Sequence, residues 1–347
     1  MGLFSRKQQP VPTGGAREFW EWWTASGAAS VAQAQGEGRL DDVVAELSPR
    51  VKAVHSALAW EIAAGEGSRL CLVVTADGDP HVRRYARRWL RRAPAADDSW
   101  EYADLRAPVA EPLEATLTVG EVELAAAEAM VAWTRRRNRL DVRLFHPGFA
   151  ALDDRQRNLA TSLLLDQTLG ELDVSLWLGR IAPGVEPPAG QPQGNLLDFS
   201  QAVTALREEL TAEDGGPTWV QMSGETPQGQ LTAVARVPLD QAIAPHLDDH
   251  VALAVGIADI DYTGFPSPTG LRELRVLEDA IAANLGASGM LVAHETSRGK
   301  RTFHYYVDST TTAADYVKKV AGTWRQGKVT VKVVTDPPWA SVSHMRT

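Results

Sequence analysis

The sequence predicts an α+β protein of two domains, and three observations lead to this fold class. Short apolar runs typical of strands alternate with amphipathic segments of helical periodicity along the chain. Turn residues separate many neighbouring runs, which favours hairpins and therefore mostly antiparallel sheets. The length of 347 residues is more than one ordinary core accommodates and suits two domains of about 150 residues each. We expect helices packed on mostly antiparallel sheets in each domain.

Two segments rich in proline and glycine divide the chain. Residues 1–15 are polar, and we expect them to be disordered. Residues 182–195 carry four prolines and three glycines between two regions of apolar periodicity. We place the domain boundary there, which gives an N-terminal domain at residues 16–181 and a C-terminal domain at residues 196–342.

The N-terminal domain is predicted to repeat the order strand, strand, helix, strand. This order suggests two helix-on-sheet halves of the ferredoxin-like kind. The expected elements are a helix at 40–55, strands at 58–63 and 70–75, a helix at 80–92, a strand at 100–105, a hairpin around Gly120, strands at 127–134 and 141–145, a helix at 153–169 and a strand at 173–178.

The C-terminal domain follows a similar pattern. Asn195 and Asp198 predict a capped helix start, and Ser267 before Pro268 predicts a second one. The expected elements are a helix from 196 to about 210, strands at 218–224 and 230–237, a short helix at 239–244, a strand at 251–258, a helix at 271–285, a hairpin of 290–295 with 302–307, a helix at 312–324 and a strand at 328–334.

Composition and charge narrow the class of protein. The chain is 44% apolar and 23% charged, as soluble globular proteins are, and no apolar run approaches the roughly 18 residues of a membrane span. The formal net charge is −9, and neither half has the basic surplus that favours binding along a nucleic acid. We expect a cytoplasmic protein without membrane contact. The single cysteine, Cys71, lies inside an apolar run, which indicates a buried and inert thiol.

Three short signatures occur in a fixed order near the end of the chain. They are Gly264-Phe265-Pro266, the run GKRTFHYYVD at 299–308, and Asp336-Pro337-Pro338-Trp339, with the predicted helix 271–285 between the first two. Over residues 217–342 the chain therefore resembles the bacterial domain-of-unknown-function family 695. The resemblance implies an α+β sandwich related to bacterial regulators that bind ribonuclease E, and it implies no known activity. The N-terminal domain is more loosely similar to segments that precede such modules in uncharacterised bacterial proteins.

A cationic helix is the most distinctive local feature. Six arginines recur at spacings of four on one side of the predicted helix 80–92, opposite an apolar stripe. Guanidinium groups bind carboxylate or phosphate oxygens in pairs, so this side could receive an acidic partner. The alternative is a solvated face balanced by the acidic residues just downstream, which end with Asp104. The six residues are Arg83, Arg84, Arg87, Arg88, Arg91 and Arg92.

Histidines and acids raise a metal hypothesis. His246 and His250 have the four-residue spacing that on one helical turn can place two imidazoles on one ion, with Asp248 between them and Asp261 downstream. The segment runs from a short helix into a strand, so the two rings need not share a face. We therefore keep a metal-dependent hydrolase with a site between the domains as an alternative only.

The hairpin near residue 298 predicts a sheet surface with polar and aromatic groups. A turn centred on Arg298-Gly299 pairs His294 with Phe303 and His304 with Ala293. His294 and His304 therefore point to opposite faces of the sheet. The same register places Met290, Val292, Phe303, Tyr305 and Val307 on the core face, and Leu291, Glu295, His304 and Tyr306 on the other. An open face of this kind could receive a partner or stack nucleobases, whereas a second helix layer or an oligomer contact is the structural alternative.

The start of the chain concentrates aromatic residues at Phe19-Trp20-Glu21-Trp22-Trp23. On a helix, Phe19, Trp22 and Trp23 share one side, with Trp20 at its edge. We expect this helix to dock onto the N-terminal domain, with capture of a partner as the alternative.

The sequence lacks the phosphate-loop, dinucleotide, zinc-peptidase and serine-nucleophile motifs of common enzymes. We therefore predict a non-catalytic protein-interaction or regulatory module without a cofactor. Its partner is expected to be a protein, of acidic character if it binds the arginine helix. The predicted contact residues are those six arginines with Glu295, His304 and Tyr306. A homo-oligomer, the metal-dependent hydrolase and a regulator of RNA or ribonuclease stay open as alternatives.

Overall fold

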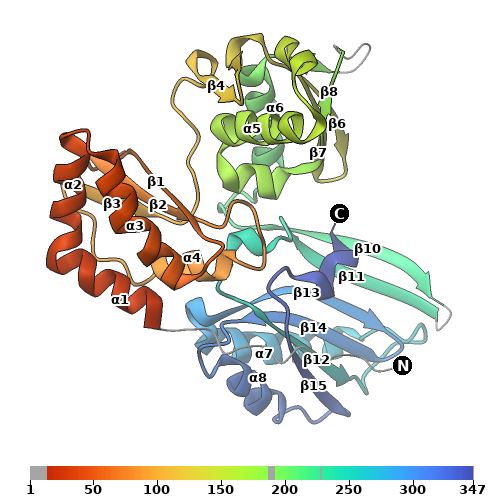
Figure 1. Cartoon of the computed structure of the whole chain (residues 1–347). Helices are drawn as coiled ribbons and strands as arrows, with labels where there is room; N and C mark the ends of the chain where they lie inside the picture. Colours follow the sequence, from red (N-terminus) through yellow and green to blue (C-terminus); the bar gives the residue numbers. More distant parts are fainter. Residues whose placement is uncertain (1–13, 187–191, 227–228, 347) are drawn as a thin grey trace, which may run out of the picture. The chain divides into compact units, whose positions relative to one another are not determined.

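The computed structural model describes residues 14–186, 192–226 and 229–346 and confirms an α+β protein (Figure 1). By its internal contacts the chain divides into two compact units, Met1–Leu105 and Arg106–Thr347. Gly14 and Gly15, which the sequence placed in a disordered tail, begin the first helix, and the rest of that tail lies outside the described residues. Among the described residues, no helix combines the length and apolar character that crossing a membrane requires.

The first unit contains a three-stranded sheet in the order β1-β2-β3. Strands β1 and β2 form an antiparallel hairpin, and β3 returns parallel to β2 after helix α4. This is the order strand, strand, helix, strand that the sequence predicts. Cys71 on β2 is 8% exposed, and burial raises the pKa of its thiol to about 11, in agreement with an inert group. The elements of this unit are α1 (Gly14–Trp22), a π-helical turn η1 (Trp23–Gly27), α2 (Ala28–Gly36), α3 (Leu40–Val54), β1 (Ala59–Ala64), β2 (Leu70–Thr75), α4 (Arg83–Leu90) and β3 (Trp100–Ala103).

Aromatic side chains form the core between the helices and this sheet. The indole of Trp20 stacks on Trp89 of α4 with ring centroids 4.6 Å apart, and its Nε1 donates to the Trp89 carbonyl at 2.8 Å. Trp23 Nε1 donates to the Tyr102 hydroxyl at 2.9 Å. The expected docking of the first helix is therefore present. Compared with the prediction, Trp20 and Trp22 exchange places. Trp20 is 6% exposed and belongs to the core, while Trp22 lies at its edge beneath the Arg50 guanidinium.

The second unit begins with a hairpin and a four-stranded sheet in the order β8-β7-β6-β9. Strand β8 returns parallel to β7 after helix α5, so the order strand, strand, helix, strand occurs again. Apolar residues of the sheet and of both helices α5 and α6 form one core. The elements are β4 (Thr116–Val119), β5 (Val122–Ala125), β6 (Met130–Arg136), β7 (Arg139–Phe145), α5 (Asp154–Trp177), β8 (Leu178–Gly184), β9 (Gln193–Gly194) and α6 (Leu196–Glu209), with short 3-10 turns η2 (Pro112–Glu114), η3 (Ala126–Glu128) and η4 (Pro147–Ala151).

Two expectations for this region are wrong. The predicted strand 173–178 is helical, because α5 continues to Trp177 past a kink at Gly170, where φ is 76°. A side chain at Gly170 would meet Pro108 Cδ at 2.9 Å, so glycine suits both the backbone and the space. Leu176 and Trp177 then enter the core from a helix. Val174 and Leu176 alternate with the polar residues Asp173 and Ser175, so the sequence pattern matched a strand equally well.

The predicted boundary at 182–195 does not separate the compact units, which divide between Leu105 and Arg106. Within that segment, β8 and β9 both pair with the four-stranded sheet. Helix α6 has the predicted cap, in which Asn195 Oδ1 accepts from the Asp198 backbone at 2.9 Å. Its apolar stripe packs into the core of the same sheet, so α6 belongs with the strands before it and not with the strands after it.

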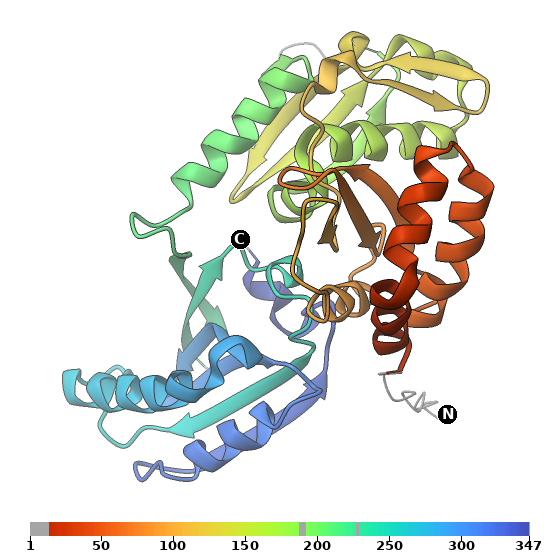
Figure 2. The same ribbon diagram turned by 90° about the vertical axis from the view of Figure 1, so that its left-hand side faces the viewer.

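The chain ends in a six-stranded antiparallel sheet in the order β10-β11-β13-β14-β12-β15 (Figures 1 and 2). Its last four strands follow the connectivity β-α-β-β-α-β, and the hairpin β10–β11 extends the sheet at the β13 edge. Helix α7 has the predicted Ser267 cap. The elements are β10 (Thr218–Thr226), β11 (Gly229–Val237), η5 (Gln241–Ile243), β12 (Asp249–Gly256), α7 (Pro268–Leu285), η6 (Gly286–Ser288), β13 (Gly289–Ser297), β14 (Lys300–Val307), α8 (Ala313–Ala321), β15 (Val329–Thr335) and η7 (Ala340–Met345).

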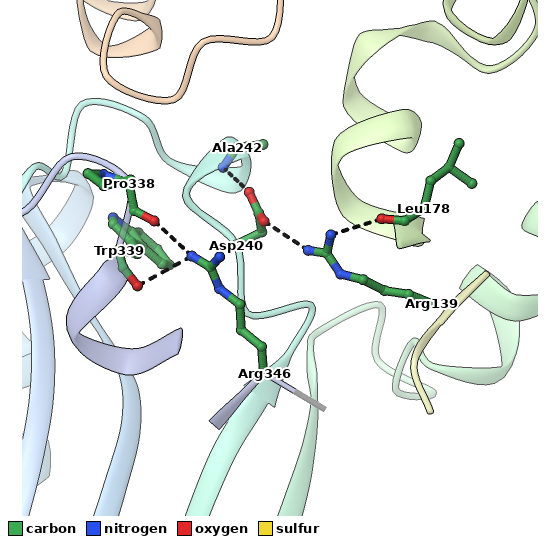
Figure 3. A network of polar contacts seen from close by, with 7 residues as sticks. All are labelled: Arg139, Leu178, Asp240, Ala242, Pro338, Trp339 and Arg346. Atoms are coloured by element: carbon green, nitrogen blue, oxygen red, sulfur yellow. Dashed lines mark hydrogen bonds and ion pairs between the residues drawn. The ribbon is translucent and has the colours of Figure 1, made fainter. Parts of the chain in front are cut away.

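One ion pair joins the four-stranded sheet to the loop before β12 (Figure 3). Arg139 on β7 donates from Nη2 to Asp240 Oδ2 at 2.8 Å and from Nη1 to the Leu178 carbonyl at 2.9 Å. The other oxygen of Asp240 caps η5 by accepting from the Ala242 backbone at 3.0 Å. Arg139 therefore connects the four-stranded sheet to the loop before β12 within the second unit.

Candidate interaction site on the C-terminal sheet

The six-stranded sheet has two differently covered faces. Helices α7 and α8 pack side by side on the first, which we call the helix face, over Val251, Phe303 and Tyr305. The C-terminal segment Asp336–Met345 packs on the second, which we call the terminal face, over Ala293 and Tyr306. The terminal face therefore carries the polar and aromatic residues that the sequence assigns to an open surface.

The strand register of the hairpin is the predicted one around its turn. His294 pairs with Phe303 and Ala293 with His304. Arg298 and Gly299 have φ values of 48° and 66°, as a two-residue hairpin turn requires. A bulge between Leu291 and Ala293 then shifts the pairing by one residue. Because of this shift, Met290 and Val292 join the terminal-face core and Leu291 joins the helix-face core, which reverses the prediction for these three residues.

Three histidines and one glutamate form a chain of hydrogen bonds on the terminal face. His250 Nε2 lies 3.0 Å from His304 Nδ1, and His304 Nε2 lies 3.3 Å from Glu295 Oε2. The other oxygen of Glu295 lies 3.0 Å from His344 Nε2. A carboxylate only accepts hydrogen bonds, so His304 and His344 both donate from Nε2. His250 Nε2 and His304 Nδ1 share one hydrogen bond, in which one ring donates and the other accepts.

Two pKa shifts describe the electrostatics of this hydrogen-bonded chain. Hydrogen bonding from His304 is the main cause that lowers the pKa of Glu295 to about 2, against the opposing effect of burial. Burial, followed by the proximity of His304, lowers the pKa of His250 to about 4. Near neutral pH the chain therefore holds an ionised Glu295 and a neutral His250. The hydrogen bond from His344 to Glu295 holds the segment Asp336–Met345, which we call the cover, on the terminal face.

Tyr306 and Trp339 form the aromatic centre of the terminal face. The two rings stack with centroids 4.3 Å apart, and both side chains are fully buried. The Tyr306 hydroxyl donates to Asp336 Oδ2 at 2.6 Å, and Trp339 Nε1 donates to the Leu247 carbonyl at 2.8 Å. Asp336 and Trp339 belong to the third sequence signature, and Tyr306 belongs to the second. The two signatures thus meet on one face.

The C-terminal segment is held by further local hydrogen bonds. Asp336 accepts from the backbones of Ala340 at 2.9 Å and Ser341 at 2.8 Å, which begins η7. Arg346 donates from Nη2 to the Pro338 carbonyl at 2.7 Å (Figure 3). Glu295, His304 and Tyr306 therefore lie under a cover. The expectation of an open sheet surface is wrong because this cover supplies its own aromatic ring and imidazole.

The residues of the metal hypothesis have separate hydrogen-bond partners. His246 Nε2 lies 3.0 Å from the Ala287 carbonyl, and Asp248 accepts from the Ser309 backbone at 3.1 Å. Asp261 accepts from the backbones of Thr263 and Phe265 in an exposed turn, while His250 contacts His304. In the described ranges, no group of three or more His, Cys, Asp or Glu residues is arranged to hold a metal ion.

The arginine helix does not present six side chains to solvent. Its six positions spread over about half of the helix circumference, because successive residues are about 100° apart. Within α4, which ends at Leu90, Arg83 and Arg88 lie at the two edges of the arginine arc and are 3% and 6% exposed. Arg87 forms an ion pair with Asp104, and Arg84 lies over the Tyr85 ring. Arg91 and Arg92 are exposed. The pair with Asp104 agrees with the alternative of a face balanced by local acids.

Sequence reasoning missed several members of the terminal-face site. His344, Asp336 and Trp339 were not connected with Glu295 and Tyr306, and His250 was named only as a metal ligand. Strand pairing explains the contact between His250 and His304. His250 pairs with Tyr306 and Ala252 pairs with His304, so the two histidines are diagonal neighbours on one face of the sheet. No sequence signal indicated that the end of the chain returns over this face.

Three comparisons with known proteins were made with the whole chain. No protein-family model matches it, and no curated protein or solved structure matches it significantly. The geometry of the described residues is therefore the basis for a functional proposal.

Proposed function

We propose that the chain is a non-catalytic regulatory module that binds a protein partner on the terminal face of its C-terminal sheet. The C-terminal segment Asp336–Met345 occupies this face when the partner is absent. One observation carries the proposal. Residues Glu295 and Tyr306, expected to contact a partner, are engaged by a short terminal segment through an imidazole and a stacked indole. Short segments outside the strands of a sheet open locally more readily than its central strands do.

The contacts of the segment indicate the chemistry of the partner. An incoming chain would place an aromatic ring on Tyr306 in place of Trp339, and a hydrogen-bond donor or cation on Glu295 in place of His344. A partner with an aromatic residue and a nearby basic residue fits both positions. A second copy of this chain could supply the same groups by exchanging its own segment.

Two observations bear on the alternatives. His246, Asp248, His250 and Asp261 have separate partners, so no geometry in the described part of the chain favours a hydrolase. The resemblance predicted from the sequence signatures of residues 217–342 would also imply a regulatory module, and no family model matches the chain. Binding to RNA through basic side chains would weaken steeply as salt increases, whereas an aromatic contact would not.

Affinity purification from the host with full-length variants tests the proposal. His344→Ala removes one hydrogen bond from the cover and leaves the strands unchanged, so it should increase recovery of the partner. Ser343→Ala is the matched control, because among the described residues this hydroxyl bonds within its own turn, to the Ala340 carbonyl. A synthetic peptide of residues 336–346 should compete with the recovered species.

The outcomes are distinct. Higher recovery with His344→Ala that the peptide abolishes supports the proposal. Equal recovery from both variants, or recovery that the peptide does not affect, contradicts it. If the recovered species is the chain itself, size-exclusion chromatography should show a dimer that the peptide dissociates. Loss of the species at high salt or after ribonuclease treatment favours an RNA partner.

A further inference from the structure

An open pocket of about 370 Å³ lies on the helix face of the six-stranded sheet. Strands β10, β11, β13 and β14 contribute its floor, and α7 with the loop before it contributes a wall. Phe265 comes from the first sequence signature, Arg301 from the second, and Arg275 from the helix between them. The signatures that define the family resemblance therefore meet at this pocket as well as on the terminal face.

Arg301 is a buried cation that forms no ion pair with the described residues. The side chain is 9% exposed, and burial lowers the pKa of its guanidinium. Among the described residues, its guanidinium donates one hydrogen bond, from Nε to the Thr296 hydroxyl at 2.9 Å, and forms no ion pair within 4.0 Å. Taking an unpaired charge out of water is unfavourable, so an anion in the pocket would gain a strong interaction.

The pocket lining carries a positive excess. Arg275 is a second guanidinium, and Glu278 is the single carboxyl group among the described lining residues. Burial raises the pKa of Glu278 against the opposing effect of Arg301, so its carboxylate is less stable here than in water. With Glu278 ionised, the two arginines leave an excess of one positive charge, which matches a ligand with one negative charge better than one with two.

A hydrogen-bonding group and an apolar wall complete the pocket. Among the described residues, His294 Nδ1 is buried without a hydrogen-bond partner. Burial, followed by Arg301, lowers the pKa of His294 to about 4, so its imidazole is neutral near pH 7. Phe265 and Leu271 form apolar parts of the lining. Inorganic phosphate would leave this wall unused, whereas an organic acid would cover it.

We propose that this pocket binds a small organic carboxylate. The guanidinium groups of Arg275 and Arg301 hold its oxygens, His294 contributes a further hydrogen bond, and its apolar part lies against Phe265 and Leu271. An arginine guanidinium binds a carboxylate through two parallel hydrogen bonds. Contact with an apolar wall adds affinity for the uncharged part of the ligand. This site lies on the face opposite to the proposed partner site, and it does not depend on the cover opening.

Binding by the full-length protein tests the proposal. The probes are benzoate and hexanoate, each compared with its neutral amide, together with inorganic phosphate. Isothermal titration and ligand-observed NMR should show saturable binding of at least one carboxylate, about tenfold or more tighter than its amide. Charge-assisted hydrogen bonds have this order of effect.

Variants on one helix give the matched control. Arg275 is exposed, so Arg275→Gln should keep the fold and weaken carboxylate binding about tenfold or more. Arg272→Gln removes a charge one turn earlier, where the side chain bonds to Thr269 and does not line the pocket, and should leave binding unchanged. Arg301→Gln, with its fold checked by circular dichroism, should abolish binding.

Three results would overturn the proposal. The first is equal affinity for the carboxylates and their amides, or saturable binding of neither. The second is carboxylate affinity that Arg275→Gln and Arg272→Gln change equally. The third is binding of phosphate without binding of any carboxylate. Because none of these measurements involves the terminal face, they leave the proposed protein interaction to its own experiment.

Discussion

The two faces of the C-terminal sheet differ in how buried charge is compensated. On the terminal face, Glu295 accepts hydrogen bonds from His304 and His344. On the helix face, Arg301 is deeply buried and its charge has no carboxylate within 4.0 Å among the described residues. Buried charges are stable when paired. The difference indicates that the chain itself completes the terminal face, whereas an added anion would complete the helix face.

The largest expected effect concerns the cover. Trp339→Ala should lower the free energy of unfolding by about 3–5 kcal/mol, because a fully buried indole leaves a cavity on the terminal face. Trp219→Ala on edge strand β10 is the control, since this indole is 43% exposed and its loss should stay below about 1 kcal/mol. Urea denaturation measures both. Similar losses in the two variants would mean that the cover contributes little to stability.

The second prediction compares two carboxyl groups whose pKa values shift in opposite directions. The lowered pKa of Glu295, about 2, contributes stability that is present above pH 4.5 and is lost as pH falls toward 2. Glu295→Gln should therefore lower stability at pH 7 by about 3 kcal/mol and flatten the acid limb of the stability profile. Denaturation between pH 2 and 7 measures the effect.

Glu278→Gln should behave in the opposite way. A raised pKa contributes stability that is present below pH 4.5 and is lost as pH rises through the folded value. Replacing this carboxyl by a neutral amide should therefore not lower stability at pH 7, and it should make the pocket more positive. If the stability of the two variants changes with pH in the same way, the two faces do not differ in how they shift the pKa of a buried carboxyl group.

Sequence reasoning located the strands well where turn chemistry fixes them. The pair Arg298-Gly299 permits the positive φ values of a tight hairpin, and the register of His294 with Phe303 follows from that turn. The bulge before Ala293 could not be predicted, because one extra residue leaves no compositional signal. Its effect was large, since it exchanged the faces of Met290 and Leu291.

Long-range packing was the part that the sequence could not supply. The apolar stripe of α6 predicted a buried helix, but periodicity does not tell which sheet receives it, and α6 packs on the sheet before it. Likewise, the residues Glu295, His304 and Tyr306 were placed on one face correctly. Their burial under Trp339 depends on where the chain end returns, which strand patterns do not contain.

The third prediction uses one histidine from each face. Burial lowers the pKa of both His250 and His294 to about 4. Between pH 6.5 and 4 the unfolded chain binds protons that the folded chain does not, so stability is full above pH 6.5 and falls as pH drops toward 4. Replacing either histidine by glutamine should reduce this fall by about 2 kcal/mol.

A carboxylate ligand should separate the two histidines. In saturating benzoate, the NMR titration midpoint of His294 should rise, because a bound anion favours the imidazolium, while that of His250 should stay unchanged. Equal movement of both midpoints would point to a general change in the protein and not to occupation of the pocket.

The smallest effect distinguishes two neighbouring tyrosines that point to opposite faces. Tyr306→Phe removes the 2.6 Å hydrogen bond to Asp336, which keeps its backbone donors, so the loss should be about 1.5 kcal/mol. The Tyr305 hydroxyl is buried on the helix face without a hydrogen-bond partner among the described residues, so Tyr305→Phe should be neutral or slightly stabilising. Urea denaturation of both variants at pH 7 compares them. If Tyr305→Phe destabilises as much as Tyr306→Phe, the hydroxyl of Tyr305 has a partner in solution, such as an ordered water, and polar groups are satisfied equally on both faces.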